Sequence, residues 1–395
     1  MLSNPLHDRY GPIVEEYLNP NTHACKVQSA LPSRQDILDA ITLLSEPDEV
    51  TYQTFETILA LEWSPACINL DLLASDAAQT SLPACFRLIK SYCEGGNRRM
   101  LDHAYGFQCL RVISLFVQFA IISQAENLNL LFTSNALRSK GESITPEFND
   151  FTCNIMIQLI SERINSRRST GKYKLETLGW SIDPSTGDGT CLAKLGGLAA
   201  DEINDLFEKL WGSRDQLLYV ATQTTTALFP GLGGLLCWMW SAIAWPFDLN
   251  ETQASQTTWA HFVDLLIRFT LCCSEYEAQL ASVLYSACHQ FGSIPISYFE
   301  TENMVDTCDS ARISVETVRK LGSDSGLHID LITALVAYAG PNVSFSNSIV
   351  PIMKAGAERL CIELGNIQRC EDLSNGLLCY FEMYFFTLTR RVTRN

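Results

Sequence analysis

The sequence predicts an all-α fold of roughly fifteen helices. The arrangement expected is either an irregular α-solenoid, an armadillo- or HEAT-like stack, or a large multi-helix bundle. Three observations predict this class: apolar residues recur at helical spacing, Gly and Pro residues interrupt the chain at short intervals, and sustained β alternation is absent from the sequence. No fixed-period repeat is found, so the stack is inferred from element type and number alone.

In the first half, three local patterns mark helix starts. Ser33 with Asp36 forms a capping-box pattern, in which each side chain bonds the other residue's backbone N–H. Thr145-Pro146 places proline at the first helical position, where its missing N–H costs nothing. Ser64-Pro65 repeats this device. These starts predict helices with short connections between them.

Residues 169–198 differ from the rest because they hold six of the twenty-two glycines. This stretch predicts either a small hairpin around Pro184 to Gly189 or a long loop that links two helical parts. We therefore expect three segments: a helical half at 1–168, a linker at 169–198 and a second helical half at 199–395.

The second half begins with the clearest amphipathic helix in the chain, predicted from Ala199 to Trp211, with acids on the face opposite its apolar stripe. Further along, Ser274 with Glu277 repeats the capping-box pattern and predicts another helix start. The apolar positions that follow lie on one stripe, which we expect to be buried: Leu280, Leu284, Ala287, Cys288 and Phe291.

A run of thirty-two residues, Gln216 to Phe247, contains no charged side chain. Its second part, Leu228 to Phe247, is as long as a membrane-spanning helix, but Pro230 and three glycines crowd its start. Burial in a helical core is the favoured interpretation. The alternatives are a membrane anchor and an exposed partner-binding patch. The patch would contain the segment's tryptophans, Trp238, Trp240 and Trp245.

Charge and cysteine usage restrict the partners and the compartment. The net charge is −16, so sequence-independent binding to nucleic acid is disfavoured. Residues 213–307 carry nine acids and two cations, which suggests a basic protein or peptide partner for this region. The fifteen cysteines are scattered without a disulfide-like or metal-binding spacing, and no signal peptide is apparent. We therefore expect a cytoplasmic protein.

The sequence presents no catalytic, metal-binding or phosphate-binding motif, so no catalytic residue, cofactor or metal is predicted. Gly231 to Gly234 lacks the third glycine and the preceding strand of a dinucleotide site. The prediction is a protein–protein interaction or scaffold protein. Two alternatives remain: a membrane-associated helical protein anchored through residues 228–247, and an all-α enzyme whose site is assembled from distant residues.

Overall fold

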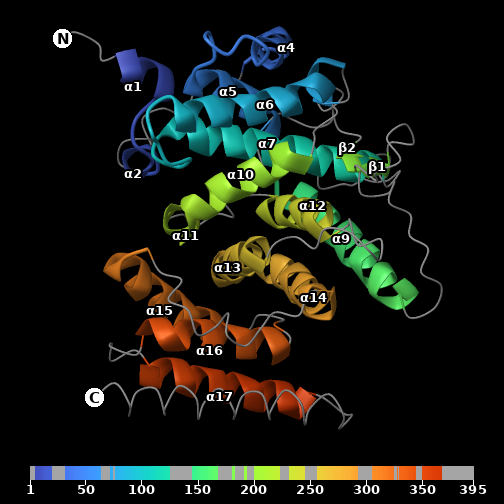
Figure 1. The fold of residues 1–395 in the computed structure, drawn as a ribbon, viewed down its shortest axis with the longest axis vertical. Helices are drawn as coiled ribbons and strands as arrows, with labels where there is room; N and C mark the ends of the chain where they lie inside the picture. The colour runs from blue at the N-terminus through green and yellow to red at the C-terminus, as the bar shows by residue number, and fades with distance from the viewer. Residues whose placement is uncertain are drawn as a thin grey trace. The chain divides into compact units, whose positions relative to one another are not determined.

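The computed structural model describes residues 5–19, 32–63, 72–73, 76–124, 145–167, 180–182, 191–193, 200–222, 231–244, 256–291, 305–323, 327, 329–343 and 349–366. These residues form fifteen α-helices and one pair of short strands (Figure 1). The all-α class is thereby confirmed. The chain divides into two compact units, Met1–Ala254 and Ser255–Asn395, and each is described by itself.

The described elements of the first unit are mostly helices, with one 3₁₀ turn and the strand pair. In chain order they are α1 Pro5–Tyr10, α2 Val14–Tyr17, α4 Arg34–Leu43, α5 Tyr52–Leu59, η2 Ala60–Trp63, α6 Asp76–Glu94, α7 Ala104–Gln124, α9 Thr145–Arg167, β1 Trp180–Ile182, β2 Cys191–Ala193, α10 Ala200–Gly212, α11 Arg214–Thr222 and α12 Leu232–Ala244. The described elements of the second unit are α13 Gln256–Cys272, α14 Glu275–Phe291, α15 Thr307–Gly322, α16 Ile329–Val343 and α17 Ile349–Asn366.

Helix α7 is the core of the first unit. It packs against α1, α2, α5, α6, α9 and α12, and Figure 1 shows it running among them. Its segment Ala104–Ile122 has the length and composition to cross a membrane, and 94% of the tested window is buried inside the protein. No other helix of the described residues passes that test. A helix that is apolar on all sides is typical of a protein core as well as of a membrane span.

Several predicted helix starts are confirmed. Ser33 accepts a hydrogen bond from the backbone N–H of Asp36 at 3.2 Å, and Asp36 accepts one from the N–H of Ser33 at 2.8 Å. Ser274 and Glu277 form the same reciprocal pair, at 3.4 and 2.9 Å. Helix α9 begins at Thr145, next to the proline that predicted it. Local side-chain chemistry therefore sets these starts.

Gly and Pro residues are expected to separate the predicted helices, but Pro83 lies inside α6, which continues to Glu94. A proline in a helix interior costs about 3 kcal/mol, because one backbone hydrogen bond is lost and the ring crowds the preceding turn. The flanking Leu82, Cys85 and Leu88 are at most 2% exposed, and their burial offsets this cost.

The Gly-rich segment contains the two strands. β1 pairs with β2 antiparallel, with Trp180 opposite Ala193 and Ile182 opposite Cys191. The residues between the strands lie outside the described part of the chain. The two compact units divide between Ala254 and Ser255, so the segment 169–198 that we expected to separate two halves lies within the first unit.

Candidate functional site

A buried guanidinium marks the candidate site, which lies in the second unit. Arg268 is 0% exposed and lies on α13, one helical turn after Asp264, which is 1% exposed. The spacing of four residues places both side chains on one face of the helix. Arg268 Nε donates a hydrogen bond to Asp264 Oδ1 at 3.1 Å. The spacing of Asp264 and Arg268 within α13 is therefore enough to bring the two side chains together.

The second carboxylate comes from the first turn of α15. Arg268 donates through both terminal nitrogens to Asp309, at 2.7 Å to Oδ1 and 2.8 Å to Oδ2. This two-point geometry is the strongest arrangement for an arginine and a carboxylate. Asp306 caps α15 by accepting from the N–H of Asp309 at 2.8 Å, and the N–H of Val305 donates to Asp309 Oδ2 at 3.1 Å.

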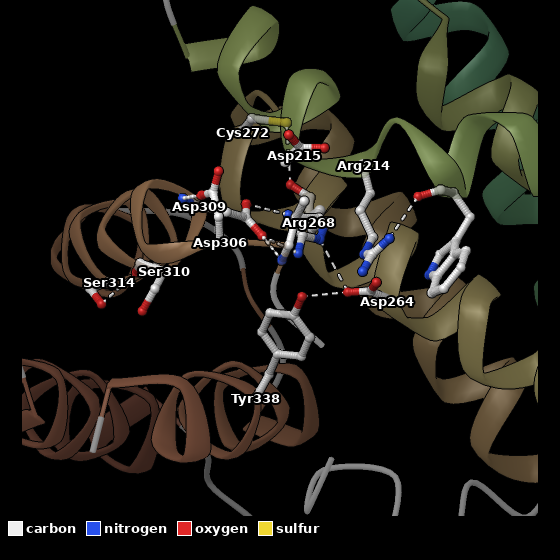
Figure 2. A network of polar contacts seen from close by, with 12 residues as sticks. Arg214, Asp215, Asp264, Arg268, Cys272, Asp306, Asp309, Ser310, Ser314 and Tyr338 are labelled. Atoms are coloured by element: carbon white, nitrogen blue, oxygen red, sulfur yellow. Dashed lines mark hydrogen bonds and ion pairs between the residues drawn. The ribbon is translucent and has the colours of Figure 1, made fainter. Parts of the chain in front are cut away.

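A tyrosine from a third helix completes the network. The hydroxyl of Tyr338, on α16, donates to Asp264 Oδ1. Figure 2 shows Tyr338 pointing toward Asp264 while Asp309 faces the opposite end of the Arg268 guanidinium. The network therefore joins α13, α15 and α16 through side chains that are at most 1% exposed.

The charges in this network are fixed at neutral pH. Burial alone would lower the pKa of Arg268, but the ionised form of Tyr338 and the two carboxylates outweigh burial and raise it well above its ordinary value. Burial raises the pKa of Tyr338 well above its ordinary value, and Asp264 raises it further. Arg268 thus stays a cation and Tyr338 stays neutral. The pKa of neither group is shifted toward the neutral range that general acid–base catalysis needs. The arrangement is therefore suited to holding three helices together.

A second polar cluster lies at the carboxyl end of α13, where carbonyl groups have no partner within the helix. Two cations from the last turn of α15 satisfy them: Arg319 donates to Leu271 O at 3.1 Å and Lys320 donates to Cys273 O at 2.8 Å. The Lys320 ammonium also lies 3.3 Å from Cys273 Sγ. Cations are favourable at this end of the helix dipole, so α15 supplies a cap for α13.

The neighbouring thiols are held in their neutral form. Burial raises the pKa of Cys273 to about 11, although the Lys320 ammonium acts in the opposite direction. Burial also raises the pKa of Cys272 well above its ordinary value, and the adjacent Cys273 raises it further. Thiolate is the reactive form of cysteine, so both thiols react slowly unless Lys320 assists.

The first unit contains a separate buried network around α7. Tyr17 donates to Glu56 Oε1 at 2.7 Å and accepts from Gln108. Arg111 donates to Gln108 Oε1 at 3.2 Å and pairs with Glu62. Burial raises the pKa of Tyr17, and Glu56 raises it further. This network joins α2, α5, η2 and α7 and keeps Tyr17 protonated.

The tryptophans of the predicted partner-binding patch are in the interior. Trp238 and Trp240 are both 0% exposed and lie on α12, which packs against α7, α9 and α10. The ring of Trp238 meets that of Phe86 edge-on, with centroids 6.2 Å apart. These two rings form no surface patch in this structure. Trp245, the third member, lies outside the described residues.

The glycines before those tryptophans have a packing role. Gly231 has φ of 87°, a conformation that favours glycine, and its N–H donates to Asn149 Oδ1 at 3.1 Å. A Cβ there would lie 2.4 Å from Gln118 Cδ. The described part of α12, Leu232–Ala244, has thirteen residues and is about 20 Å long.

Several acids that suggested a partner surface in residues 213–307 are used within the fold. Asp215 pairs with Arg99 and Asp264 pairs with Arg268. Glu277 and Asp306 accept backbone hydrogen bonds at helix starts. The remaining acids of this region lie outside the described residues or have undescribed side chains: Asp248, Glu251, Glu275, Glu300 and Glu302.

The buried network was missed from the sequence, although one signal was present. Asp264 and Arg268 stand four residues apart inside a run of apolar side chains, a pattern that predicts a paired charge on a buried face. Nothing local identifies Asp309 or Tyr338 as their partners, because those residues belong to other helices.

Among the described residues, no group of three or more His, Cys, Asp or Glu side chains is placed to hold a metal ion. Comparisons with protein-family models, with curated proteins and with solved structures give no match for this chain.

Proposed function

We propose that this chain is a protein-interaction scaffold that binds a basic protein segment. One observation carries the proposal: α4 and the turn after it present an exposed surface that is predominantly acidic. Residues 32–63 contain seven acids and a single cation, Arg34. The acids exposed on this surface are Asp36, Asp39, Glu46, Asp48 and Glu49. A predominantly acidic surface attracts a basic partner and orients its approach.

The turn already accommodates one cationic side chain. Arg9, from α1, donates a hydrogen bond from its guanidinium to the carbonyl oxygen of Pro47 at 2.5 Å. Pro47 stands between the exposed Glu46 and Asp48, so a backbone acceptor and carboxylates lie together here. An arginine or lysine of a partner would find the same kinds of acceptor.

The proposal places the basic partner at residues 36–49 rather than at 213–307. Buried charges such as Arg268 are matched within the fold, whereas the acids of the α4 surface face solvent. The nine described cysteines carry free thiols, which supports a reducing compartment such as the cytoplasm.

The scaffold proposal includes a helical arrangement of two kinds. In the first unit, helices distant in sequence pack around α7, as in a bundle. In the second unit, α15, α16 and α17 pack on one another in succession, as in a short irregular stack. Stacked helices offer extended faces to partners, which suits a scaffold.

The test measures binding of a fluorescent octalysine peptide to the full chain and to two matched triple variants. The first variant neutralises the turn: Glu46→Gln, Asp48→Asn and Glu49→Gln. The control neutralises three exposed acids on other helices: Glu94→Gln, Glu208→Gln and Glu358→Gln. Both variants change the net charge equally.

We expect the turn variant to weaken binding about tenfold and the control by less than about threefold, because close charge pairs contribute roughly 0.2–1 kcal/mol each. Binding of the wild-type chain should also weaken as salt is raised. An equal loss in both variants would show that only net charge attracts the peptide, and it would refute a built surface at the turn.

A further inference from the structure

A lysine and a cysteine are held side by side at the junction of α13 and α15. Lys320 is 4% exposed and Cys273 is 9% exposed. The Lys320 Nζ lies 3.3 Å from Cys273 Sγ and is fixed by its hydrogen bond to the Cys273 carbonyl at 2.8 Å. An amine and a sulfur atom at this separation need little movement to form a bond.

We propose that Cys273 and Lys320 are a modification site at which a peroxide produces a reversible sulfur–nitrogen cross-link. The oxidant is hydrogen peroxide or an alkyl hydroperoxide. The first product is a sulfenic acid on Cys273, and the second is a sulfenamide that joins Sγ to Nζ. Sulfenic acids condense with nitrogen nucleophiles in this way. The proposal is independent of the scaffold function.

The proton and electron balance follows from the contact. The resting Cys273 thiol is neutral, and the reactive species is the thiolate that forms when it loses its proton to solvent; Lys320 donates to Cys273 Sγ and stabilises that thiolate. The thiolate attacks hydrogen peroxide and breaks its O–O bond, which oxidises sulfur by two electrons, and the departing hydroxide takes a proton from the ammonium. The neutral amine then attacks the sulfenic sulfur, the S–N bond forms, and hydroxide leaves with the second nitrogen proton as water. One peroxide is consumed and two waters are released.

The contact with Lys320 distinguishes Cys273 from its neighbour. Both thiols donate to carbonyl oxygens of the preceding turn: Cys272 to Arg268 and Phe269, each at 3.3 Å, and Cys273 to Thr270 at 3.3 Å. Of the two, Cys273 is the one whose Sγ also lies against the Lys320 ammonium. Cys308, at the start of α15, is exposed. Oxidation of Cys308 therefore reports that the peroxide dose was sufficient, and Cys272 serves as the adjacent comparison.

The cross-link would join the end of α13 to the last turn of α15 covalently. These helices are already connected there by hydrogen bonds from Arg319 and Lys320. A covalent bond at the same point would oppose their separation without requiring a new arrangement. Oxidation would thus stabilise the second unit, and a thiol reductant would reverse the effect.

The experiment treats the full folded chain with hydrogen peroxide, digests it with trypsin and identifies the products by mass spectrometry. Unmodified Lys320 permits cleavage and releases peptide 321–354, whereas a sulfenamide at Nζ blocks cleavage. The expected product joins peptide 269–312 to peptide 320–354 with a loss of two hydrogen atoms, about 2 Da. Dithiothreitol should restore peptide 321–354.

Three variants make the result decisive. Cys273→Ser should abolish the cross-link and Cys272→Ser should preserve it. Lys320→Arg keeps a cationic donor without a nucleophilic amine, so dimedone should trap the sulfenic acid on Cys273 instead. Circular dichroism confirms that each variant folds. If peptide 321–354 is released in full while Cys308 is oxidised, or if Lys320→Arg leaves Cys273 with no dimedone adduct, the proposal is wrong.

Discussion

Replacing Arg268 by methionine tests whether the buried network stabilises the second unit through charge. Methionine keeps an unbranched side chain and removes the guanidinium, so Asp264 and Asp309 remain buried without their cation. Breaking a buried pair by removing one partner costs about 3–5 kcal/mol. We expect Arg268→Met to lower the free energy of unfolding of the second unit by that amount.

The structure supports this magnitude through the number of bonds lost. Among the described residues, Arg268 makes three hydrogen bonds to carboxylate oxygens. Each bond to a charged group contributes roughly 1.5–3 kcal/mol, so a simple sum exceeds the expected loss. The bonds share one side chain, and the carboxylates relax when it is removed, so their contributions do not add. Tyr338→Phe removes one bond to Asp264 and should cost about 1.5–3 kcal/mol.

The assay combines urea denaturation, followed by circular dichroism, with hydrogen exchange of α13, α15 and α16. Exchange is needed because a chain of two units is not described by one unfolding transition. The matched control is Lys354→Met, whose side chain on α17 is 74% exposed and which should cost less than about 0.5 kcal/mol.

Two outcomes would refute the reasoning about Arg268. If Arg268→Met costs no more than Lys354→Met, the carboxylates do not depend on a buried cation. If Arg268→Met and Tyr338→Phe cost the same, the guanidinium contributes no more than one neutral hydroxyl. In either case the network would be a consequence of packing rather than a cause of stability.

Two further predictions concern a glycine and a thiol. Gly106→Ala should destabilise the first unit by about 3 kcal/mol or more in urea denaturation, because the new Cβ would lie 1.8 Å from the backbone oxygen of Met100. The control is Gly212→Ala, where a Cβ would meet nothing within 4 Å, and it should change stability by less than about 1 kcal/mol. Equal effects of the two substitutions would contradict this account. Because the pKa of Cys273 is raised from 9.0 to about 11, the folded state binds the thiol proton more tightly than the unfolded chain does. This tighter binding of the proton stabilises the folded state. The stabilisation is complete below pH 9.0 and is lost as the pH rises to about 11. The second unit should lose on the order of 2–3 kcal/mol over this range from Cys273, and Cys273→Ala should show a correspondingly smaller loss; identical pH dependence in both proteins would contradict the prediction.

The fold class could be predicted because helix signals are local. The capping pairs at Ser33 and Ser274 set helix starts through atoms three residues apart. The predicted apolar stripe of α10 consists of Ile203, Leu206, Phe207, Leu210 and Trp211. The first four are at most 2% exposed, whereas Trp211 is only partly buried. Pro83 was misinterpreted because its cost is offset by burial against other helices, which the local sequence does not contain.

The candidate site could be predicted only in part. The spacing of Asp264 and Arg268 was available from the sequence, but the choice of Asp309 and Tyr338 as partners depends on how α13, α15 and α16 pack. The acids of 213–307 illustrate the same limit, since net charge does not distinguish a free carboxylate from one that caps a helix, as Asp306 does. Burial of Trp238 and Trp240 agrees with the favoured interpretation of their uncharged segment.

The two polar attachments between α13 and α15 have a consequence for structural uniqueness. Apolar side chains on two helices can often interlock in more than one way, displaced by a helical turn of about 5.4 Å. Asp309 and Lys320 are eleven residues apart on α15; Asp309 binds Arg268 in the last two turns of α13, and Lys320 binds Cys273, the residue after its end. A slip of either helix would leave a charged group buried without its acceptor. The two polar attachments therefore favour a single alignment of α13 and α15.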